Sequence, residues 1–287
     1  MENSEQLQAL LPTWKLDKNT VNWLWFWLRI RSNTDDILAK RGYGSPAMCN
    51  LIADHINSKE GLLGRLYTLR DTLLPGHFFD WINARGRLPA WLLHQLNEER
   101  NARLPHNQIM RTRFTSDEIN FSLYLTPKEE FIVRINLSDE PAQAKESHLQ
   151  QLQQNWNKHK LNDKYFSWFT RGGNEKKKCQ CAWEWYQTAH PHLNTYTQEF
   201  SKKEDVLRFL DIAPFTLEAK LQHLDMIKRK FKAQQTRANR QGKAQTNLSL
   251  SDDARKQLDS LARKQGKSKT EIVEKLIQAA YTHDLLS

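Results

Sequence analysis

Apolar and polar positions alternate most regularly near the C-terminal end of the sequence, from Gln245 to Leu250. Alternation with a period of two residues is typical of a strand with one buried face. Leu248 and Leu250 fall on the apolar side of this predicted strand, together with Thr246. The side chains on its polar side are Gln245, Asn247 and Ser249.

Two short helices are predicted after this strand. Ser251 is a suitable N-cap for the first helix, and Gly266 suits a left-handed residue at its C-terminal end. The second helix is predicted to begin at Ser268, where Glu271 completes a capping box. Apolar positions recur with helical spacing at Leu258, Leu261, Ile272, Val273, Leu276 and Ile277.

One strand and two helices of this size cannot bury their apolar faces alone. The economical partner for the strand is the same strand of a second copy. This predicts an antiparallel two-stranded ribbon over four helices, and therefore a two-fold homodimer. The alternative is a small helical hairpin that completes a larger core. The predicted dimer core consists of Leu248, Leu250, Leu258, Leu261, Ile272, Val273, Leu276 and Ile277.

The combination of strand, helix caps, glycine and apolar faces between residues 245 and 281 resembles the ribbon-helix-helix family of DNA-binding proteins. In that family the outward side chains of the paired strands enter the major groove. The resemblance implies base contacts by Gln245, Asn247 and Ser249; Gln and Asn can both donate and accept hydrogen bonds at the edge of adenine. It also implies that a DNA phosphate binds at the start of the second helix, at Lys267, Ser268 and Lys269.

The sequence as a whole predicts a mainly α fold. An exception is a β-hairpin, predicted because Ile119–Leu125 and Phe131–Leu137 alternate around a turn at residues 126–129. A strand followed by a capped helix is the alternative, although the β-branched run FIVRI favours a second strand. The predicted segments are a helical domain of unknown role (1–110), the hairpin (111–140), a linker and helical region (141–215), a basic helix and arm (216–243) and the ribbon-helix-helix unit (244–287).

Tryptophan is dense in the first hundred residues of the chain. Aromatic side chains at helical spacing usually belong to a core, because each one buries a large apolar area. Trp25 and Phe26 lie off the face that Trp23 and Trp27 share. They are therefore the candidates for a surface that docks a protein partner or stacks on bases.

Positive charge is concentrated before and within the C-terminal unit. The formal net charge is +10, and residues 221–270 contain thirteen lysines and arginines against four acidic residues. The rest of the chain is nearly neutral, and such an asymmetric distribution is typical of a nucleic-acid contact surface. A solvated linker is the alternative for the basic stretch. The predicted phosphate contacts before the strand are Lys228, Arg229, Lys230, Lys232, Arg237, Arg240 and Lys243.

The order of a helical region, the stretch IKRKFKAQQTRANRQGK and the ribbon-helix-helix unit is similar to the MatP family of bacterial chromosome-organising proteins. The similarity covers about residues 156–281 and is tightest over 221–280. It implies a dimer that binds a short palindromic DNA site with both the ribbon and the preceding helical region. MatP proteins continue into a coiled coil and lack a counterpart of residues 1–140. Bridging of distant sites is therefore not implied, and the N-terminal half keeps an open role.

No motif for catalysis is present, and we expect a protein that is not an enzyme and needs no cofactor. Cys179, Cys181, His190 and His192 have the residue types of a zinc site, but one residue between the cysteines is a tight spacing. Few cysteines and the lack of a leader or membrane span predict a cytoplasmic, nucleoid-associated protein. The alternative function is an effector module, residues 1–220, that recruits a protein partner and is delivered to DNA by the C-terminal unit.

Overall fold

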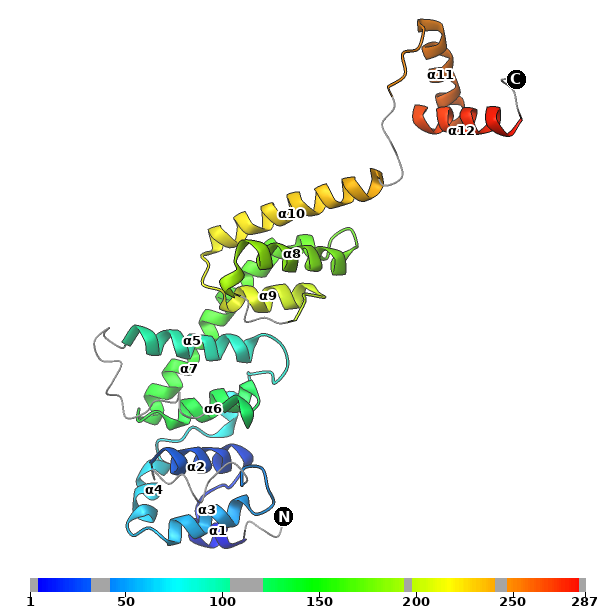
Figure 1. Cartoon of the computed structure of the whole chain (residues 1–287). Helices are drawn as coiled ribbons and strands as arrows, with labels where there is room; N and C mark the ends of the chain where they lie inside the picture. Colours follow the sequence, from blue (N-terminus) through cyan, green and yellow to red (C-terminus); the bar gives the residue numbers. More distant parts are fainter. Residues whose placement is uncertain (1–4, 32–41, 104–120, 194–197, 241–246, 284–287) are drawn as a thin grey trace. The chain divides into compact units, whose positions relative to one another are not determined.

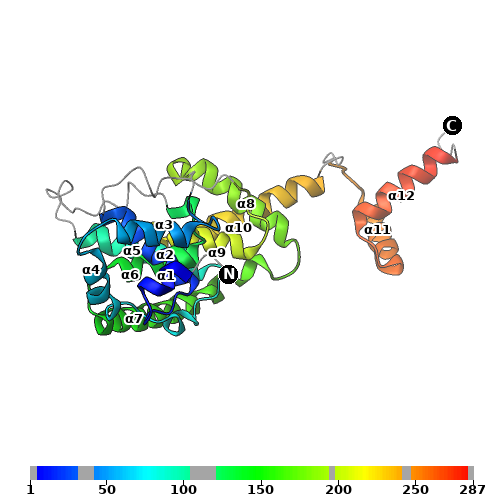
Figure 2. The ribbon, with the colours of Figure 1, turned by 90° about the horizontal axis from the view of Figure 1, so that it is seen from below.

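The computed structural model describes residues 5–31, 42–103, 121–193, 198–240 and 247–283. Within these ranges every regular element is helical, which confirms the mainly α prediction (Figure 1 and, from below, Figure 2). The chain divides into two compact units, Met1–Lys232 and Ala233–Ser287. Among the described helices, none has the length and apolar content needed to cross a membrane. The finer domain boundaries given above stay predictions.

The first unit is built from α-helices joined by short 3-10 helices. Helix α10 begins in this unit and continues into the second. Its elements are α1 (Glu5–Leu10), α2 (Lys18–Arg31), α3 (Met48–Asn57), α4 (Leu62–Arg70), η2 (Gly76–Phe79), α5 (Leu88–Arg103), η4 (Phe121–Leu123), α6 (Pro127–Leu137), α7 (Ala142–Lys160), η5 (Leu161–Phe169), α8 (Glu175–Ala189), η6 (Pro191–Leu193), α9 (Lys203–Ile212) and α10 (Leu217–Arg240).

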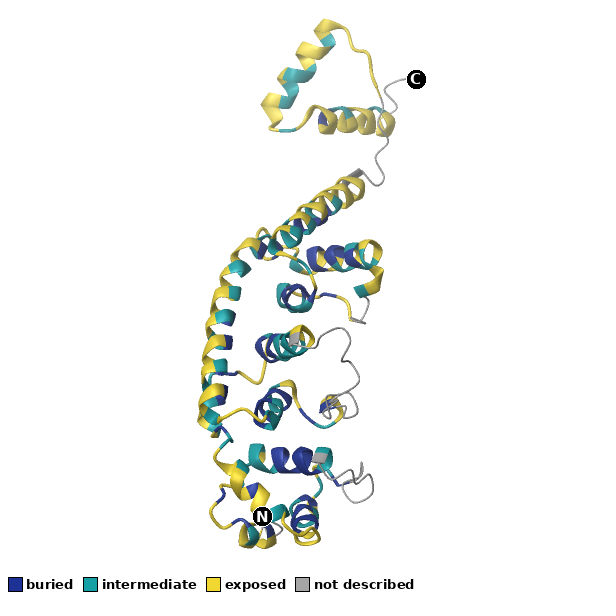
Figure 3. Ribbon diagram, turned by 90° about the vertical axis from the view of Figure 1, so that its left-hand side faces the viewer, coloured by how far each residue is buried: buried dark blue, intermediate teal, exposed yellow. Residues whose placement is uncertain are grey.

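Three hydrophobic clusters make up the core of the first unit. The first joins α1–α4 with η4 and α6, the second joins η2 and α5 with α6 and α7, and the third joins η5 with α8, α9 and α10. Buried residues therefore lie on the faces that each helix turns toward its neighbours (Figure 3). Residues 142–160, within the predicted linker and helical region, form α7 and bury Leu149, Leu152 and Trp156.

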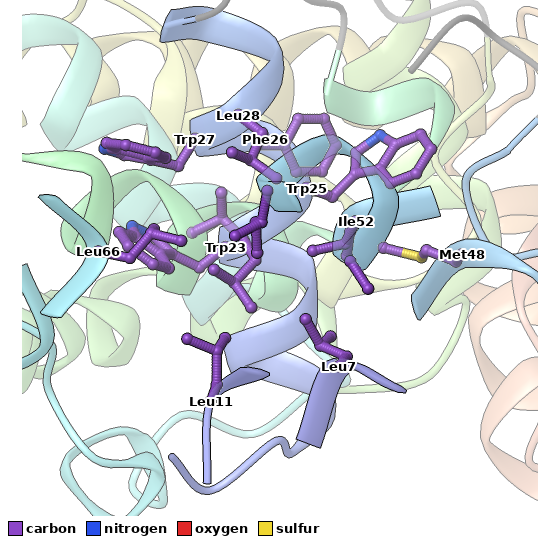
Figure 4. Close-up of a cluster of buried hydrophobic side chains, with 14 of the residues drawn as sticks. Leu7, Leu11, Trp23, Trp25, Phe26, Trp27, Leu28, Met48, Ile52 and Leu66 are labelled. Carbon is purple, nitrogen blue, oxygen red and sulfur yellow. The ribbon is translucent and has the colours of Figure 1, made fainter. Parts of the chain in front are cut away.

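Helix α2 lies at the centre of the first cluster, and its residues 22–28 are all buried (Figure 4). Trp25 and Phe26 are both almost completely buried, so the hypothesis that they form a docking or stacking surface is wrong. The ring of Phe26 packs 4.8 Å from that of Phe121. Gly42 is needed beside Trp25, because a Cβ atom at this position would lie 2.6 Å from the indole. The aromatic residues of α2 therefore have a structural role.

The predicted second strand of the hairpin is wrong, because residues 127–137 form helix α6. Thr126 and Glu129, assigned to a turn from the sequence, form a capping box, and Pro127 occupies the first helical turn. The β-branched run is buried around the whole helix: Val133 packs in the first cluster, and Phe131 in the second. A helix with apolar side chains all round is stable when it is enclosed on all sides. Of the predicted first strand, the described part contains the 3-10 helix η4.

Buried polar groups tie the first cluster to the second. The indole of Trp23 donates to the carbonyl of Asn136 on α6 at 3.0 Å, and the side-chain oxygen of Asn136 accepts from the amide of Leu74 at 3.0 Å. Lys145 on α7 donates to the carbonyls of Thr72 and Asn136. Burial lowers the pKa of Lys145 to about 8, and the nearby Asp139 and Glu140 oppose this effect. Because these groups have partners, their burial is compatible with a stable core.

An ion cluster centred on Arg87 ties the second cluster to the third. Its guanidinium donates to both carboxylate oxygens of Asp211 on α9 at 2.7 Å, and to those of Asp163 on η5 at 2.7 and 3.1 Å. His159 on α7 lies 2.7 Å from Asp211. The guanidinium also lies over the ring of Trp156, 5.5 Å from its centroid. Arg87 thus joins the start of α5 to three later elements.

Removing Arg87 is expected to destabilise the first unit strongly. Replacement by Leu leaves Asp211, whose side chain is 4% exposed, without its bidentate partner. Breaking a buried ion pair from one side costs about 3–5 kcal/mol. We expect Arg87→Leu to lower the free energy of unfolding by about 3 kcal/mol or more in urea denaturation of the full chain at neutral pH. The exposed Arg85 is the matched control, and Arg85→Leu is expected to change stability by less than about 0.5 kcal/mol.

The difference in the free energy of unfolding between the wild type and Arg87→Leu is expected to depend on pH. Burial raises the pKa of Asp211, but hydrogen bonds from His159 and Arg87 lower it by more. The pKa of Asp211 therefore lies below its ordinary value of 3.8. The stabilisation is therefore complete above that value and is lost as the pH falls through the folded-state pKa. The advantage of the wild type over Arg87→Leu should shrink in acid. Equal stability of the two proteins at neutral pH would contradict the assigned role of Arg87.

Candidate nucleic-acid interface

The second unit contains α11 (Asp252–Gln265) and α12 (Lys269–Thr282), and its helix ends are as the sequence predicts. The hydroxyl of Ser251 accepts a hydrogen bond from the amide of Ala254 at 3.3 Å, which confirms the N-cap of α11. Gly266 has φ = 62° and ends the helix in the left-handed conformation. At Ser268 the amide donates to Glu271 at 2.8 Å and the hydroxyl accepts from the amide of Glu271 at 3.2 Å, a complete capping box.

Lysine side chains near the start of α12 fall into two groups. Lys269 forms an ion pair with Asp259 on α11, and this contact lowers the pKa of Asp259. Lys267 lies beside Lys275 instead, and the proximity of Lys275 lowers the pKa of Lys267. Lys267 also precedes the N-terminus of α12, where the helix dipole is positive, so these two like charges favour binding of an anion. Lys275 was missed by the sequence analysis. It lies two turns after Ser268, so helical periodicity places it on the same face.

The apolar face of the second unit is mostly uncovered in the single chain. Ile272 is buried between the helices, and Leu258, Leu261 and Val273 are half-buried. Leu248, Leu250, Leu276 and Ile277 are exposed, Ile277 by 62%. Contiguous apolar side chains at this level of exposure mark an interaction surface. All eight side chains of the predicted dimer core are thus present, and half of them lack cover within one chain.

Residues 247–250, which precede α11, have no regular secondary structure in the single chain. A strand ladder needs a second strand to pair with, so the predicted ribbon stays a prediction. Asn247 and Ser249 are exposed, as are Leu248 and Leu250. Gln245 and Thr246 lie outside the described residues, as does Lys243.

The basic residues of α10 differ in their surroundings. Within the first unit, Lys228 forms an ion pair with Asp225 at 2.9 Å and Lys230 with Glu184 on α8 at 3.5 Å, whereas Arg229 is exposed. Packing of α10 ends at Phe231, and residues 232–238, including Lys232 and Arg237, are exposed around the whole helix. The ion pair with Glu184 partly neutralises the charge of Lys230. Arg240 is the last residue of α10.

The structure does not bring the four candidate zinc ligands together. Cys179 and Cys181 are buried in α8, where the thiol of Cys181 faces the carbonyl of Ile227 at 3.9 Å. Burial raises the pKa of Cys179 to about 12 and that of Cys181 to about 11, which opposes the thiolate form that binds a metal. His190 packs 4.8 Å from His223 instead, ring centroid to centroid. In the part of the chain that the structure describes, no group of three His, Cys, Asp or Glu side chains is arranged to hold a metal ion.

Comparison with known protein families matches residues 244–283 to the ribbon-helix-helix proteins of the copG family. The match covers the segment before α11, both helices and their caps. Residues 244–283 are therefore a ribbon-helix-helix unit, and this class of unit supports a DNA-binding role. Comparison with curated proteins and with solved structures gives no match to the chain.

A charge placed in the uncovered apolar face is expected to prevent dimer formation. Leu276→Glu puts a carboxylate where Leu276 would be buried against a second copy, and an unpaired buried charge is strongly unfavourable. We expect the full-length wild type to be a dimer and Leu276→Glu to be a monomer in sedimentation equilibrium at micromolar concentration. Gln278→Glu is the matched control, because it adds the same charge to an exposed position of α12. A Leu276→Glu protein that remains dimeric would exclude this face as the dimer interface.

Proposed function

We propose that this protein is a non-enzymatic, sequence-specific double-stranded DNA-binding homodimer that recognises a palindromic site with paired strands. One observation carries the proposal: the residues that match the ribbon-helix-helix family form two capped helices whose apolar face is open and whose α12 start is cationic. Such a unit needs a second copy for its core and an anion for its charged end. A DNA duplex bound by a two-fold dimer meets the second requirement at two phosphates.

Base recognition is proposed for the polar side of the ribbon. When Leu248 and Leu250 face the helices of the dimer, alternation turns Gln245, Asn247 and Ser249 outward. A two-stranded ribbon fits the major groove, where each base pair presents a distinct pattern of donors and acceptors. The amides of Gln245 and Asn247 suit adenine, and Ser249 suits several bases. Two copies of these residues related by a two-fold axis favour a palindromic site.

Phosphate contacts are proposed at two places. The first is the start of α12, with Lys267, Lys275 and the backbone amides after Ser268. The second is the exposed end of α10 and the arm after it, with Lys232, Arg237, Arg240 and Lys243, and with Lys228, Arg229 and Lys230 earlier in the helix. Lys232 and Arg237 are exposed, so a phosphate backbone can reach them.

Two biological roles fit such a dimer, namely organisation of a chromosome or replicon, as in the MatP family, and transcriptional repression. The genomic distribution of binding sites separates them, because an architectural protein binds many sites within one region and a repressor binds at promoters. A second candidate function belongs to the first unit, which has a core of its own made of three clusters. A self-sufficient unit next to a DNA-binding unit favours a module that recruits a protein partner to DNA.

Asn247 is predicted to supply sequence specificity. We expect Asn247→Ala to weaken binding of the cognate site by ~1–3 kcal/mol and to relax the base preference at the contacted position. The site is first obtained by selection of bound fragments from random and genomic DNA with wild-type protein, and affinity is then measured by fluorescence anisotropy. Selection repeated with Gln245→Ala plus Asn247→Ala should lose the two-fold motif. Affinity for unrelated DNA is the internal control and should not change.

An unchanged motif in the double variant would exclude the polar side of the ribbon as the specificity element. Salt-sensitive binding without any motif in the wild type would mean that the chain binds DNA only through its positive charge. In that case the first unit becomes the place to seek the function.

Lys275 is predicted to contact a phosphate and to carry no sequence information. Lys275→Ala should weaken cognate and unrelated DNA equally. Each phosphate contact contributes about 0.9 to the slope of log K against log salt, so the dimer should lose about 1.8 from this slope. Titration at several salt concentrations measures the effect. Lys256→Ala, which removes an exposed lysine of α11 beside Asp253, is the control and should leave the slope unchanged. A slope equal to that of the wild type would contradict the phosphate site.

A further inference from the structure

The first unit contains a hollow of about 440 Å³ that is lined in part by Arg87. One side is the loop before α5, and the other is a single face of α7, where lining residues recur at helical spacing. The lining consists of Trp81, Asn83, Arg85, Arg87, Leu88, Gln153, Trp156, Asn157, Lys160 and Glu204. A volume of this size lies within the range of small-molecule sites in proteins.

Hydrogen bonds fix the conformation of the loop before α5, which forms one side of the hollow. Lys128 on α6 donates to the carbonyl of Ile82 at 2.6 Å, and the amide of Arg85 donates to the side chain of Asn83 at 3.1 Å. Gly86 has φ = 101°, which a residue with a side chain rarely adopts. The buried ion cluster then fixes Arg87, the next residue. The lining is thus in place before any ligand binds, so little conformational entropy is lost on binding.

The lining combines aromatic surface, side-chain amides and positive charge. The indoles of Trp81, which is half-buried, and Trp156, which is buried, supply aromatic surface. Asn83, Gln153 and Asn157 offer donors and acceptors at the rim.

Positive charge exceeds negative charge at this site. Arg85 and Lys160 are exposed, and neither forms an ion pair with a residue in the described ranges. Lys160 lies instead over the ring of Trp156, 5.9 Å from its centroid. The carboxylate of Glu204 already has cationic neighbours, Lys202 at 3.6 Å and Arg208 at 3.9 Å. The hollow is therefore suited to an anion that also carries a planar, hydrogen-bonding group.

We propose that this hollow binds a nucleotide. The base lies against the indole of Trp81, and the amides at the rim bond to its edge, as in proteins that bind single nucleic-acid strands by stacking. The phosphate lies between Arg85 and Lys160, where the guanidinium provides a bidentate contact. The nucleotide is either a free mononucleotide or part of a single strand, since both present the same chemistry. This site is separate from the duplex-binding residues of the second unit and does not depend on them.

Isothermal titration calorimetry of the full-length protein tests the proposal. The probes are AMP, GMP, CMP and UMP, with adenosine and inorganic phosphate for the two halves of the ligand, and a short single-stranded oligonucleotide for the second source. We expect one mononucleotide or the oligonucleotide to bind once per chain. Adenosine and phosphate should each bind at least about tenfold more weakly, since each lacks half of the contacts. Preference for the oligonucleotide identifies a strand as the source, and preference for a mononucleotide identifies a free ligand.

Variants locate the binding in the hollow. Arg85→Gln plus Lys160→Gln should weaken nucleotide binding at least about tenfold, because both charge-assisted contacts are lost. Trp81→Leu should weaken it as well. Arg65→Gln, at an exposed arginine of α4 outside the hollow, is the matched control and should bind like the wild type. Urea midpoints show whether each variant is folded.

Two results would overturn the proposal. One is the lack of any binding of the nucleotides and the oligonucleotide at millimolar concentration. The other is equal binding by the wild type and the folded Arg85→Gln, Lys160→Gln protein. Binding of the duplex site, measured in parallel, should be unaffected by these substitutions. Loss of the nucleotide alone therefore concerns the hollow, and loss of duplex binding alone concerns the ribbon-helix-helix unit.

Discussion

The first unit depends on the bidentate pairing of Arg87 with Asp163 and Asp211. Its three hydrophobic clusters contain different helices, and apolar contact alone does not fix where the third cluster lies on the second, because it is not directional. The guanidinium has five donors in a fixed plane, so it donates to two carboxylates in one geometry only. Arg87 therefore sets the position of α9 and η5 on α5. The same residue closes one end of the loop that lines the proposed nucleotide site.

Elements that depend on local interactions were predictable from the sequence, and elements that depend on contacts between distant residues were not. Local signals predicted the helical character of residues 1–110 and the ends of α11 and α12. Helix α6 shows where local pattern fails. Its cap at Thr126 and Glu129 was visible in the sequence, but the run FIVRI has strand propensity. Enclosure by two clusters decided in favour of the helix, and that enclosure comes from residues far away in the sequence. The ion cluster was likewise invisible, since Arg87 and Asp211 are 124 residues apart.

The helix ends of the candidate interface were predictable because each one depends on residues close together in the sequence. Ser251, Gly266 and the Ser268–Glu271 box are interactions within four residues, and the structure confirms each one. Contacts between helices changed the details. Lys269 is paired with Asp259, and Lys275 takes its place beside Lys267. The ribbon stays a prediction, because a strand ladder needs a second strand to pair with.

The two units differ in how much of their apolar surface is buried within one chain. The first unit buries most of its large apolar side chains, including Trp23, Trp25 and Trp27. The second leaves Leu248, Leu250, Leu276 and Ile277 open, which one chain cannot cover. In the proposed dimer, folding of this unit is linked to association, because the ribbon needs two copies. DNA that binds the proposed ribbon would bind the dimer and not the single chain, and would therefore stabilise the dimer by mass action.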